Sequence, residues 1–355
     1  MKQKKYIIIL LIFFFGVNNL KAQVSDVITG LNYPGGIAFY GNELYFSQYN
    51  GTISKININD NPLNIEEVIN TGNILGEFEI INDYLYFANF SGNKISKINL
   101  TIANPTIIDV LDVFLPSGLK ASGNKLYFSS GSGSSTVLNQ GKVSFINISD
   151  SNPIPQEVLT GQAYPLSLEL KNNYLFISDK YDNKITKINL SDTTYTPIDF
   201  ISGLNEPTGL IFNGDILYIS EQGNNKITKI DTSNTVITLV DFITGLGGPA
   251  QMDIKLTDMY ITETLSGKIS KSENTMLSVK NFSLEKVNVF PNPSYNFIQI
   301  SGFESRMSIS IYDVIGNELL KQVVVNNQKI DISHLNTGIY FLKFENNEIF
   351  KICKK

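Results

Sequence analysis

The sequence predicts an all-β protein: a six-bladed β-propeller over residues 23–283, followed by a small β-sandwich over residues 284–355. Three observations lead to this prediction. A short apolar segment recurs six times, similar turn residues surround the copies, and after about residue 284 the repeat gives way to short alternating segments separated by Pro, Asn and Gly. Repeats of about 42 residues that each hold four short strands are typical of propeller blades.

The first 22 residues have the pattern of a secretory signal peptide. A basic start, MKQKK, precedes ten apolar residues and a polar segment that ends at Ala22. This apolar core is too short for a membrane-spanning helix. We therefore expect cleavage after Ala22, export of the remainder, and no transmembrane segment in the mature chain. Residues 1–22 hold four of the 28 Lys and Arg and none of the 33 Asp and Glu. The mature chain is therefore acidic and poorly suited to bind nucleic acid.

Six copies of the apolar segment define the repeat, and their second residues are Leu44, Leu85, Leu126, Leu175, Leu217 and Met259. Before most copies a Gly, Asn or Asp pair such as Gly41-Asn42 predicts a two-residue hairpin turn. A short polar loop and a strand of the general form KIxKI follow, and a segment such as DFITG completes the unit. These four antiparallel strands form one predicted blade.

The KIxKI segments resemble an amphipathic helix in one respect, because their isoleucines are three residues apart. However, NKISKINL (93–100) is short, rich in isoleucine and bounded by Gly and Asn, which favours a strand. In a strand, residues three apart point to opposite faces. We therefore expect Ile95 and Ile98 to pack in opposite directions, against the two neighbouring blades.

The start of the repeat predicts how the propeller closes. DVITGLNYP (26–34) matches DFITGLGGP (241–249) and DFISGLNEP (199–207), whose first residues form the outermost strand of a predicted blade. The N-terminal copy has no blade before it. We therefore expect Val24–Thr29 to pair with the last blade, which joins the start of the propeller to its end and removes open edges.

The blade pattern LYISEQGNNKITKI (217–230) resembles NHL-type repeats and their relatives among the gluconolactonase-like, senescence-marker and streptogramin-lyase propellers. This resemblance covers residues 24–283 and implies a fold rather than an activity. Trp is absent from the chain, so the signature of WD40 repeats is missing.

The C-terminal module has its own motifs. VFPNP (289–293), IYDVIGNELL (311–320), LNTGIYFLKF (335–344) and a basic tail resemble, as a set, the type A C-terminal sorting domain of the Bacteroidetes type IX secretion system. The resemblance implies contact with that secretion machinery, passage across the outer membrane, cleavage of this domain, and release or surface attachment of the product. A generic adhesive β-sandwich is the alternative. The residues that carry the resemblance are Pro291, Asn292, Pro293, Gly316, Gly338 and Tyr340.

The residue types present in the propeller exclude several kinds of catalytic site. The only histidine, cysteine and arginine of the chain are His334, Cys353 and Arg306, all in the C-terminal module. Ser-His-Asp and Cys-His catalysis, His/Cys zinc sites and an arginine-based sialidase site therefore cannot be assembled in the propeller. Carboxylate chemistry remains, as does an oxygen-ligated cation such as Ca²⁺.

One column of the repeat contains carboxylates. Six positions before the second residue of each apolar copy stand Ala38, Glu79, Lys120, Glu169, Ile211 and Asp253. If this column faces the central channel, Glu79, Glu169 and Asp253 are candidate metal ligands, as in the gluconolactonase-like proteins that the repeats resemble. The alternative is a ring of solvated charges in which Lys120 pairs with an acid.

The loops that flank each copy hold two more sets of interest. One set is expected to bond its own loops and comprises Gln48, Asn89, Ser130, Asp179, Glu221 and Glu263. The other is aromatic, should gather on one face of the propeller, and comprises Tyr33, Tyr49, Phe90, Tyr164 and Tyr181. Exposed aromatic residues suit the binding of a glycan or a peptide, although tyrosine also occurs in loops for structural reasons. A Gly/Ser-rich insertion at 130–141 predicts a mobile flap on the same face.

The sequence therefore leaves three functions open. The first is an exported or cell-surface propeller without catalytic activity that binds a ligand. The second is a metal-dependent hydrolase of the gluconolactonase type. The third is a structural or adhesive surface component. The candidate ligand-binding residues are Glu79, Lys120, Glu169, Asp253, Tyr33, Tyr49, Tyr164 and Tyr181, of which Glu79, Glu169 and Asp253 are also the candidate metal ligands or acid and base.

Overall fold

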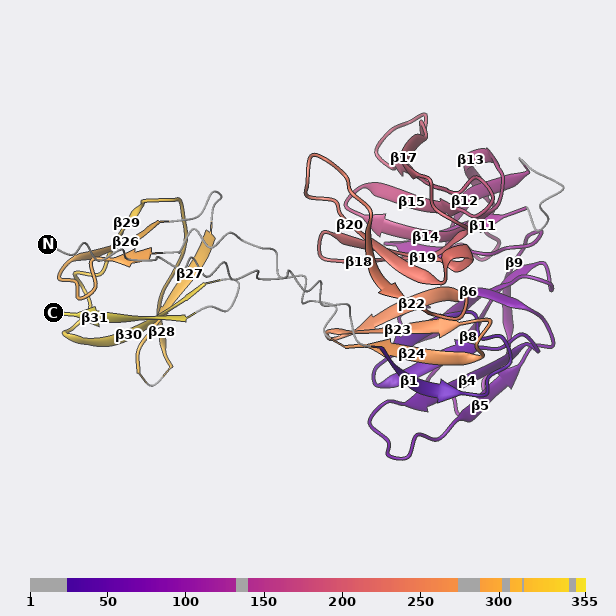
Figure 1. Ribbon diagram of the computed structural model, residues 1–355, viewed down its shortest axis with the longest axis horizontal. Coiled ribbons are helices and arrows are strands. Elements are labelled where there is room, and N and C mark those ends of the chain that lie inside the picture. Colours follow the sequence, from indigo (N-terminus) through magenta and orange to yellow (C-terminus); the bar gives the residue numbers. More distant parts are fainter. Residues whose placement is uncertain (1–23, 132–139, 274–287, 302–306, 315, 345–348) are drawn as a thin grey trace, which may run out of the picture. The chain divides into compact units, whose positions relative to one another are not determined.

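The computed structural model describes residues 24–131, 140–273, 288–301, 307–314, 316–344 and 349–355. Two compact units divide the chain, one up to Met276 and one from Leu277 onward (Figure 1). The predicted signal peptide at 1–22, the boundary predicted at 283/284 and most of the predicted flap lie outside the described residues.

The first unit is built from six four-stranded antiparallel sheets, as predicted. We number these blades 1 to 6 in the order of their innermost strands. Blade 1 holds β2 (Ile37–Tyr40), β3 (Glu43–Ser47), β4 (Thr52–Asn57) and β5 (Glu66–Asn70), and blade 2 holds β6 (Leu75–Ile81), β7 (Tyr84–Asn89), β8 (Lys94–Asn99) and β9 (Ile108–Asp112). Blade 3 holds β10 (Leu119–Ser122), β11 (Lys125–Ser130), β12 (Gly141–Asn147) and β13 (Gln156–Gln162).

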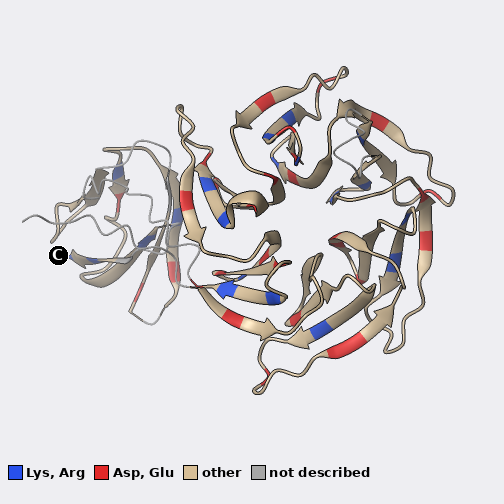
Figure 2. Cartoon of the chain, turned by 45° about the vertical axis from the view of Figure 1, so that its right-hand side comes forward, with Lys and Arg blue, Asp and Glu red and all other residues tan. Residues whose placement is uncertain are grey.

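The other three blades repeat this order around a common centre, which Figure 2 shows from a second direction. Blade 4 holds β14 (Pro165–Lys171), β15 (Tyr174–Asp179), β16 (Lys184–Asn189) and β17 (Ile198–Ser202). Blade 5 holds β18 (Pro207–Asn213), β19 (Ile216–Glu221), β20 (Lys226–Asp231) and β21 (Val240–Thr244), with a 3₁₀ turn at Gln222–Asn224. Blade 6 holds β22 (Pro249–Lys255), β23 (Asp258–Glu263), β24 (Lys268–Ser272) and β1 (Val24–Thr29).

Blade 6 confirms the predicted closure, because its outermost strand comes from the start of the propeller. β1 pairs antiparallel with β24, from Val24 opposite Ser272 to Thr29 opposite Lys268. Ile28 is buried in a cluster that contains residues of both blade 6 and blade 1. The closure therefore gives the last blade its fourth strand and covers the edge that β24 would otherwise expose.

The repeat also places a lysine–aspartate ion pair at equivalent positions in four blades, and blade 3 has the matching pair Lys142–Glu157. A lysine that begins the third strand contacts an aspartate of the outermost strand, and Figure 2 shows such blue and red residues on neighbouring strands. In blade 6 the aspartate is supplied by β1, where Asp26 lies 2.7 Å from Lys268. The pairs are Lys94–Asp109, Lys184–Asp199, Lys226–Asp241 and Lys268–Asp26.

The isoleucines of the KIxKI strands pack as predicted. Ile95 and Ile98 of β8 are both fully buried but belong to different hydrophobic clusters. Ile98 packs with Tyr45 and Ile53 of blade 1, whereas Ile95 packs with Leu126 and other residues of blade 3. β8 thus contributes one isoleucine to the interface on each side of its blade.

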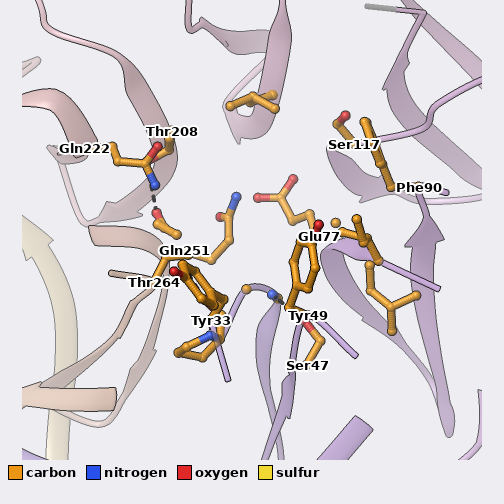
Figure 3. Close-up of a pocket in the computed structure, with 18 of the residues that line it drawn as sticks. Tyr33, Ser47, Tyr49, Glu77, Phe90, Ser117, Thr208, Gln222, Gln251 and Thr264 are labelled. Carbon is orange, nitrogen blue, oxygen red and sulfur yellow. Dashed lines mark hydrogen bonds between the residues drawn. The ribbon is translucent and has the colours of Figure 1, made fainter. Parts of the chain in front are cut away.

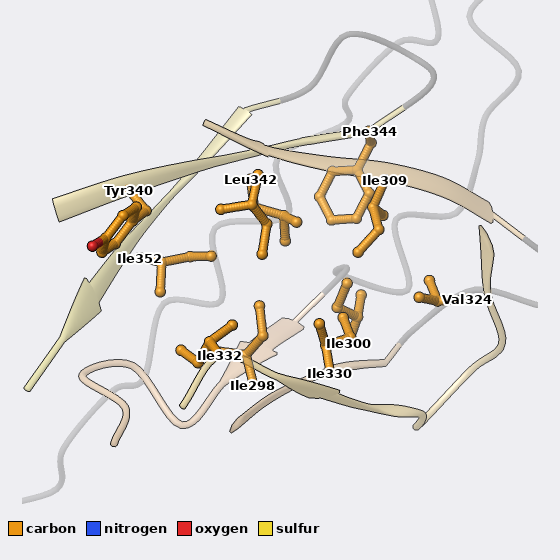
Figure 4. Packing of buried hydrophobic residues seen from close by; sticks show 11 residues of the cluster. Ile298, Ile300, Ile309, Val324, Ile330, Ile332, Tyr340, Leu342, Phe344 and Ile352 are labelled. Carbon is orange, nitrogen blue, oxygen red and sulfur yellow. The ribbon is translucent and has the colours of Figure 1, made fainter. Parts of the chain in front are cut away.

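The second unit is a β-sandwich. One sheet has the order β25-β26-β29 and the other β28-β27-β30-β31. Isoleucines of the first sheet, such as Ile298 and Ile330, pack against Leu342 and Phe344 of the second (Figure 4). The strands are β25 (Asn288–Phe290), β26 (Phe297–Ser301), β27 (Met307–Tyr312), β28 (Glu318–Val324), β29 (Lys329–Asp331), β30 (Gly338–Phe344) and β31 (Ile349–Lys354).

The motif residues of this unit lie at turns and strand ends. Cis peptide bonds precede Pro291 and Pro293, and the Asn292 side chain between them bonds to the backbone of Lys351 and Cys353 in the last strand. Gly316 has a φ of 91°, which favours glycine. Gly338 begins β30, and the hydroxyl of Tyr340 donates a hydrogen bond to the Asn336 carbonyl.

In the described parts of the chain, no helix has the length and apolar character to cross a membrane.

Candidate functional site

Two cavities follow one another through the centre of the propeller. The first, of about 330 Å³, is lined mainly by loops and is called the loop-face pocket. The second, of about 190 Å³, is lined by the innermost strands and is called the charged chamber. Glu77 and Gln251 line both cavities, so these two side chains stand at the boundary between them.

The charged chamber contains the column predicted to face the channel. Ala38, Glu79, Lys120, Glu169, Ile211 and Asp253 all line it. The Lys120 ammonium lies 3.0 Å from the Glu169 carboxylate and 3.9 Å from that of Glu79. Lys120 therefore bridges the acids of blades 2 and 4, the pairing that the structural alternative anticipates.

Backbone N–H groups hold the carboxylates of the chamber as well. The two oxygens of Asp253 accept hydrogen bonds from Phe39 (2.8 Å) and Ile254 (2.7 Å). Glu79 accepts one from Ala121 and Glu169 accepts one from Leu170. Asp253 and Glu79 thus each bond to the innermost strand of a neighbouring blade, whereas Glu169 bonds within its own strand.

This arrangement does not fit a metal ion. In the part of the chain that the structure describes, no group of three or more His, Cys, Asp or Glu side chains could hold one. Glu79, Glu169 and Asp253 share the chamber, but their oxygens face Lys120 or backbone donors. A Ca²⁺ ion needs six to eight oxygen ligands converging on one point.

Burial and mutual attraction shift the charges of this chamber. Burial raises the pKa of Glu79 and of Asp253, and the attraction of Lys120 opposes the rise in both. For Lys120, burial disfavours the ammonium, but the carboxylates of Glu169 and Glu79 outweigh it and raise the lysine pKa. Lys120 is therefore a fixed cation in the chamber.

The loop-face pocket brings together four of the five predicted loop aromatics. Tyr33, Tyr49, Phe90 and Tyr164 line it (Figure 3 labels the first three). The rings of Tyr33 and Tyr49 are 6.0 Å apart, and both side chains are more than half exposed. Tyr181 does not line the pocket but packs on Tyr164 with ring centroids 5.0 Å apart.

Two residues of the set that was expected to bond its own loops, Gln48 and Asp179, hold the backbone near these rings. The Gln48 side-chain oxygen accepts a hydrogen bond from Asn32 N–H, next to Tyr33. The buried Asp179 carboxylate accepts bonds from the N–H groups of Ala163 and Tyr164. These hydrogen bonds therefore fix the backbone next to Tyr33 and at Tyr164.

The polar lining of the pocket was not singled out from the sequence. It includes Lys180, Gln222, Gln251 and Thr264. The Lys180 ammonium lies 2.7 Å from the side-chain amide oxygen of Gln222 and 3.2 Å from the Glu206 carboxylate. One column of the repeat lies five positions after the second residue of each apolar copy, and it holds Tyr49, Phe90, Lys180, Gln222 and Thr264. The positions of Lys180, Gln222 and Thr264 beside the aromatic residues could therefore have been read from the sequence.

Glu77 was not singled out from the sequence either. It lies in β6 two residues before Glu79, and Figure 3 shows its carboxylate pointing into the pocket, toward Gln251. The Ser167 hydroxyl donates a 2.7 Å hydrogen bond to one carboxylate oxygen. The other oxygen accepts bonds from the N–H groups of Leu119 (2.9 Å) and Leu168 (3.4 Å).

The pKa of the Glu77 carboxyl is also raised. Its side chain is nine-tenths buried, and this burial raises its pKa to about 8, against the opposing effects of the Ser167 and Leu119 hydrogen bonds and of Lys120. The equivalent positions in other blades are Gly36, Gly118, Ser167, Gly209 and Gln251. Glu77 is thus the only acid in its column of the repeat.

The predicted flap falls largely outside the described residues. Gly131 and Gln140, which flank the segment 132–139, line a separate cavity of about 370 Å³ and not the loop-face pocket.

Comparison with known proteins identifies the C-terminal module and the fold of the propeller. Residues 288–355 match the secretion system C-terminal sorting domain. This domain indicates secretion through the type IX system, to the cell surface or beyond it. No curated protein matches the chain by sequence.

Three solved structures illustrate the fold. A luciferin-regenerating enzyme has a TM-score of 0.61 and 13% identity, over 74% of this chain and 97% of its own. A gluconolactonase from Xanthomonas campestris has a TM-score of 0.59 and 11% identity, over 71% and 89%. A chain of a nidogen/laminin complex has a TM-score of 0.54 and 14% identity, over 66% and 89%. Residues 288–355 are therefore a secretion system C-terminal sorting domain, carried behind a β-propeller that shares the fold of gluconolactonase-like proteins.

Proposed function

We propose that this chain is an exported binding protein whose ligand occupies the loop-face pocket. The observation that carries the proposal is the composition of this 330 Å³ cavity: aromatic rings, amide groups and hydroxyl groups line it together, and one buried carboxyl lies at its inner end. Ligand pockets commonly combine an apolar surface with a few placed polar groups in this way.

This mixed lining favours a ligand with an apolar face and a polar edge. Tyr33, Tyr49 and Phe90 come from blades 1 and 2, whereas Gln222, Gln251 and Thr264 come from blades 5 and 6. Aromatic rings contribute a large apolar contact area, and side-chain amides donate and accept hydrogen bonds. A short peptide or a glycan, the ligands expected from the sequence, would contact both the aromatic rings and the polar side chains.

The hydrolase alternative has less support. Its candidate residues Glu79, Glu169 and Asp253 lie in the charged chamber, where Lys120 and backbone N–H groups engage them. The structural neighbours include two proteins named as enzymes and a chain of a protein complex. Such a likeness supports a fold and leaves the activity to the site itself.

The route of export completes the proposal. A signal peptide at 1–22 would direct the chain out of the cytoplasm, and the type IX machinery would recognise the sorting domain and remove it. The product would then be released or attached to the surface of a bacterium of the Bacteroidetes. The match of residues 288–355 to the sorting domain supports this route.

The proposal is tested by screening glycan and peptide libraries against the purified chain and two variants. Tyr49→Ala removes an exposed ring from the pocket, and Phe114→Ala removes an equally exposed ring that does not line it. We expect a ligand whose affinity falls about tenfold or more in Tyr49→Ala and is unchanged in Phe114→Ala. Equal losses in both variants would favour a structural or adhesive role.

A further inference from the structure

The aromatic rings of the propeller fall into two groups, according to whether a lysine covers them. Several rings outside the pocket are covered: the Lys97 ammonium lies 4.7 Å from the ring centre of Tyr84, and that of Lys229 lies 5.0 Å from Phe242. Among the described residues, no lysine lies in this way over Tyr33, Tyr49, Phe90 or Tyr164. The pocket therefore presents π faces that the protein's own cations leave open.

The carboxyl of Glu77 lies at the inner end of the same pocket. Its oxygens accept one hydrogen bond from Ser167 and two from backbone N–H groups. A carboxylate offers about four acceptor positions, so the described donors leave room for one more. The Lys180 ammonium, which also lines the pocket, is paired with the Glu206 carboxylate and donates a hydrogen bond to the Gln222 side chain.

We propose that the loop-face pocket binds the ammonium group of a small organic cation, between its aromatic rings and the carboxylate of Glu77. This inference rests on the proposed function and specifies the class of its ligand. Aromatic rings attract ammonium groups through their negative faces, and the attraction strengthens when water is excluded. A buried carboxylate supplies the counter-charge, because a cation lowers the cost of keeping an anion out of water.

Binding of the cation is coupled to the release of a proton from Glu77. Because the pKa of Glu77 is about 8, the free protein holds the carboxyl mostly protonated near neutral pH. The cation stabilises the carboxylate, so the proton leaves Glu77 for the solvent as the ammonium group enters the pocket. The other charged groups that act on Glu77 are Lys120, which favours its ionised form, and Glu79, which opposes it.

The probe is choline, compared with its neutral carbon isostere, in which a tert-butyl group replaces the trimethylammonium group. Titration calorimetry of the purified chain should show choline binding about tenfold more tightly than the isostere. The affinity for choline should rise about 10- to 30-fold from roughly pH 6.5 to roughly pH 8.5, as Glu77 ionises. In buffers of different ionisation enthalpy, the heats should reveal release of up to one proton near pH 7.

Two variants and a control locate the effect. Glu77→Gln should weaken choline about tenfold or more, abolish the pH dependence, and leave the isostere unchanged. Tyr49→Leu removes an exposed ring and serves if Glu77→Gln does not fold; it should weaken choline more than the isostere. Glu66→Gln removes the same charge from the outermost strand of blade 1 and should change nothing.

The proposal is overturned if choline does not bind, or if choline and its isostere bind alike with no pH dependence. The alternative result is a neutral sugar or an N-acetylated peptide that binds in the pocket, with its affinity lost in Tyr49→Leu and kept in Glu77→Gln. This result would contradict the proposal of a cationic ligand and would preserve the proposed binding function. Failure of the proposed function itself would appear as ligands whose affinity Tyr49→Leu does not change.

Discussion

The hydroxyl of Ser167 donates a 2.7 Å hydrogen bond to the carboxylate of Glu77, although 90 residues separate them in the chain. Ser167 also accepts a hydrogen bond from the N–H of Leu210, and Glu77 accepts one from Leu119. Blades 2, 3, 4 and 5 therefore meet in one buried network. This network sits where the loop-face pocket meets the charged chamber, so the same carboxyl contributes to stability and to the pocket.

The first prediction concerns how Glu77 makes stability depend on pH. Its pKa is about 8 in the folded chain and near 4.5 when unfolded. The folded state therefore binds more protons between these values, and stability falls as pH rises from about 4.5 to about 8. The loss is at most on the order of 5 kcal/mol for this one group.

Glu77→Gln should remove much of this pH dependence. Urea unfolding of the propeller, measured near pH 5 and near pH 8.5, should show a smaller fall in the variant than in the native chain. Glu66→Gln, an exposed acid on the outermost strand of blade 1, is the control and should follow the native chain. An identical fall in Glu77→Gln would mean that Glu77 is ionised in the folded protein throughout this range.

A second prediction concerns Lys120, which holds two carboxylates of the charged chamber. Lys120→Met leaves Glu169, whose side chain is 9% exposed, and Glu79 without their cation. We expect a loss of about 2–4 kcal/mol in the free energy of unfolding near neutral pH. Lys94→Met, in one of the repeated surface pairs, should cost less than about 1 kcal/mol. Equal costs would show that the chamber is effectively solvated.

A third prediction tests the closure by β1. Ile28 and Ile243 occupy equivalent positions in β1 and β21 and are both buried. Ile28→Ala should therefore destabilise the propeller by about 2–4 kcal/mol, as Ile243→Ala does, because each change leaves a cavity between two blades. Asp26→Asn, on the exposed side of β1, should have little effect on the melting temperature. A much smaller cost for Ile28→Ala would mean that β1 frays from blade 6.

A fourth prediction concerns calcium. Because Lys120 and backbone donors engage the chamber carboxylates, adding Ca²⁺ or a chelator should leave the melting temperature of the purified chain unchanged. Lys120→Met provides an internal comparison, since it frees Glu79 and Glu169 to accept a cation. A calcium-dependent rise in the melting temperature of the native chain would restore the metal-site hypothesis.

The sequence allowed the fold to be predicted because the repeat expresses the same packing six times. Ile95 and Ile98 could be assigned to opposite blade interfaces from strand geometry alone, and β1 could be assigned to blade 6 because DVITG copies DFITG. The C-terminal sandwich followed from its turn motifs in the same way.

The candidate site was predicted only in part, because it depends on what differs between copies. The aromatic residues were found through their loops, and four of them share one pocket. Glu77 was missed because Glu79, two residues later, stood in a column with other charges, whereas the column of Glu77 is mostly Gly, Ser and Gln. Its burial and its partner Ser167 depend on how four blades converge, and the spacing within one repeat does not reveal this.

The most direct test of the account is to soak crystals of the purified chain in mixtures of small organic fragments and to map where they bind. We expect fragments to occupy the loop-face pocket, against Tyr49 and Phe90 and beside the carboxyl of Glu77. Fragments that leave this pocket empty and gather in the charged chamber, or at the outer edges of the blades, would contradict it.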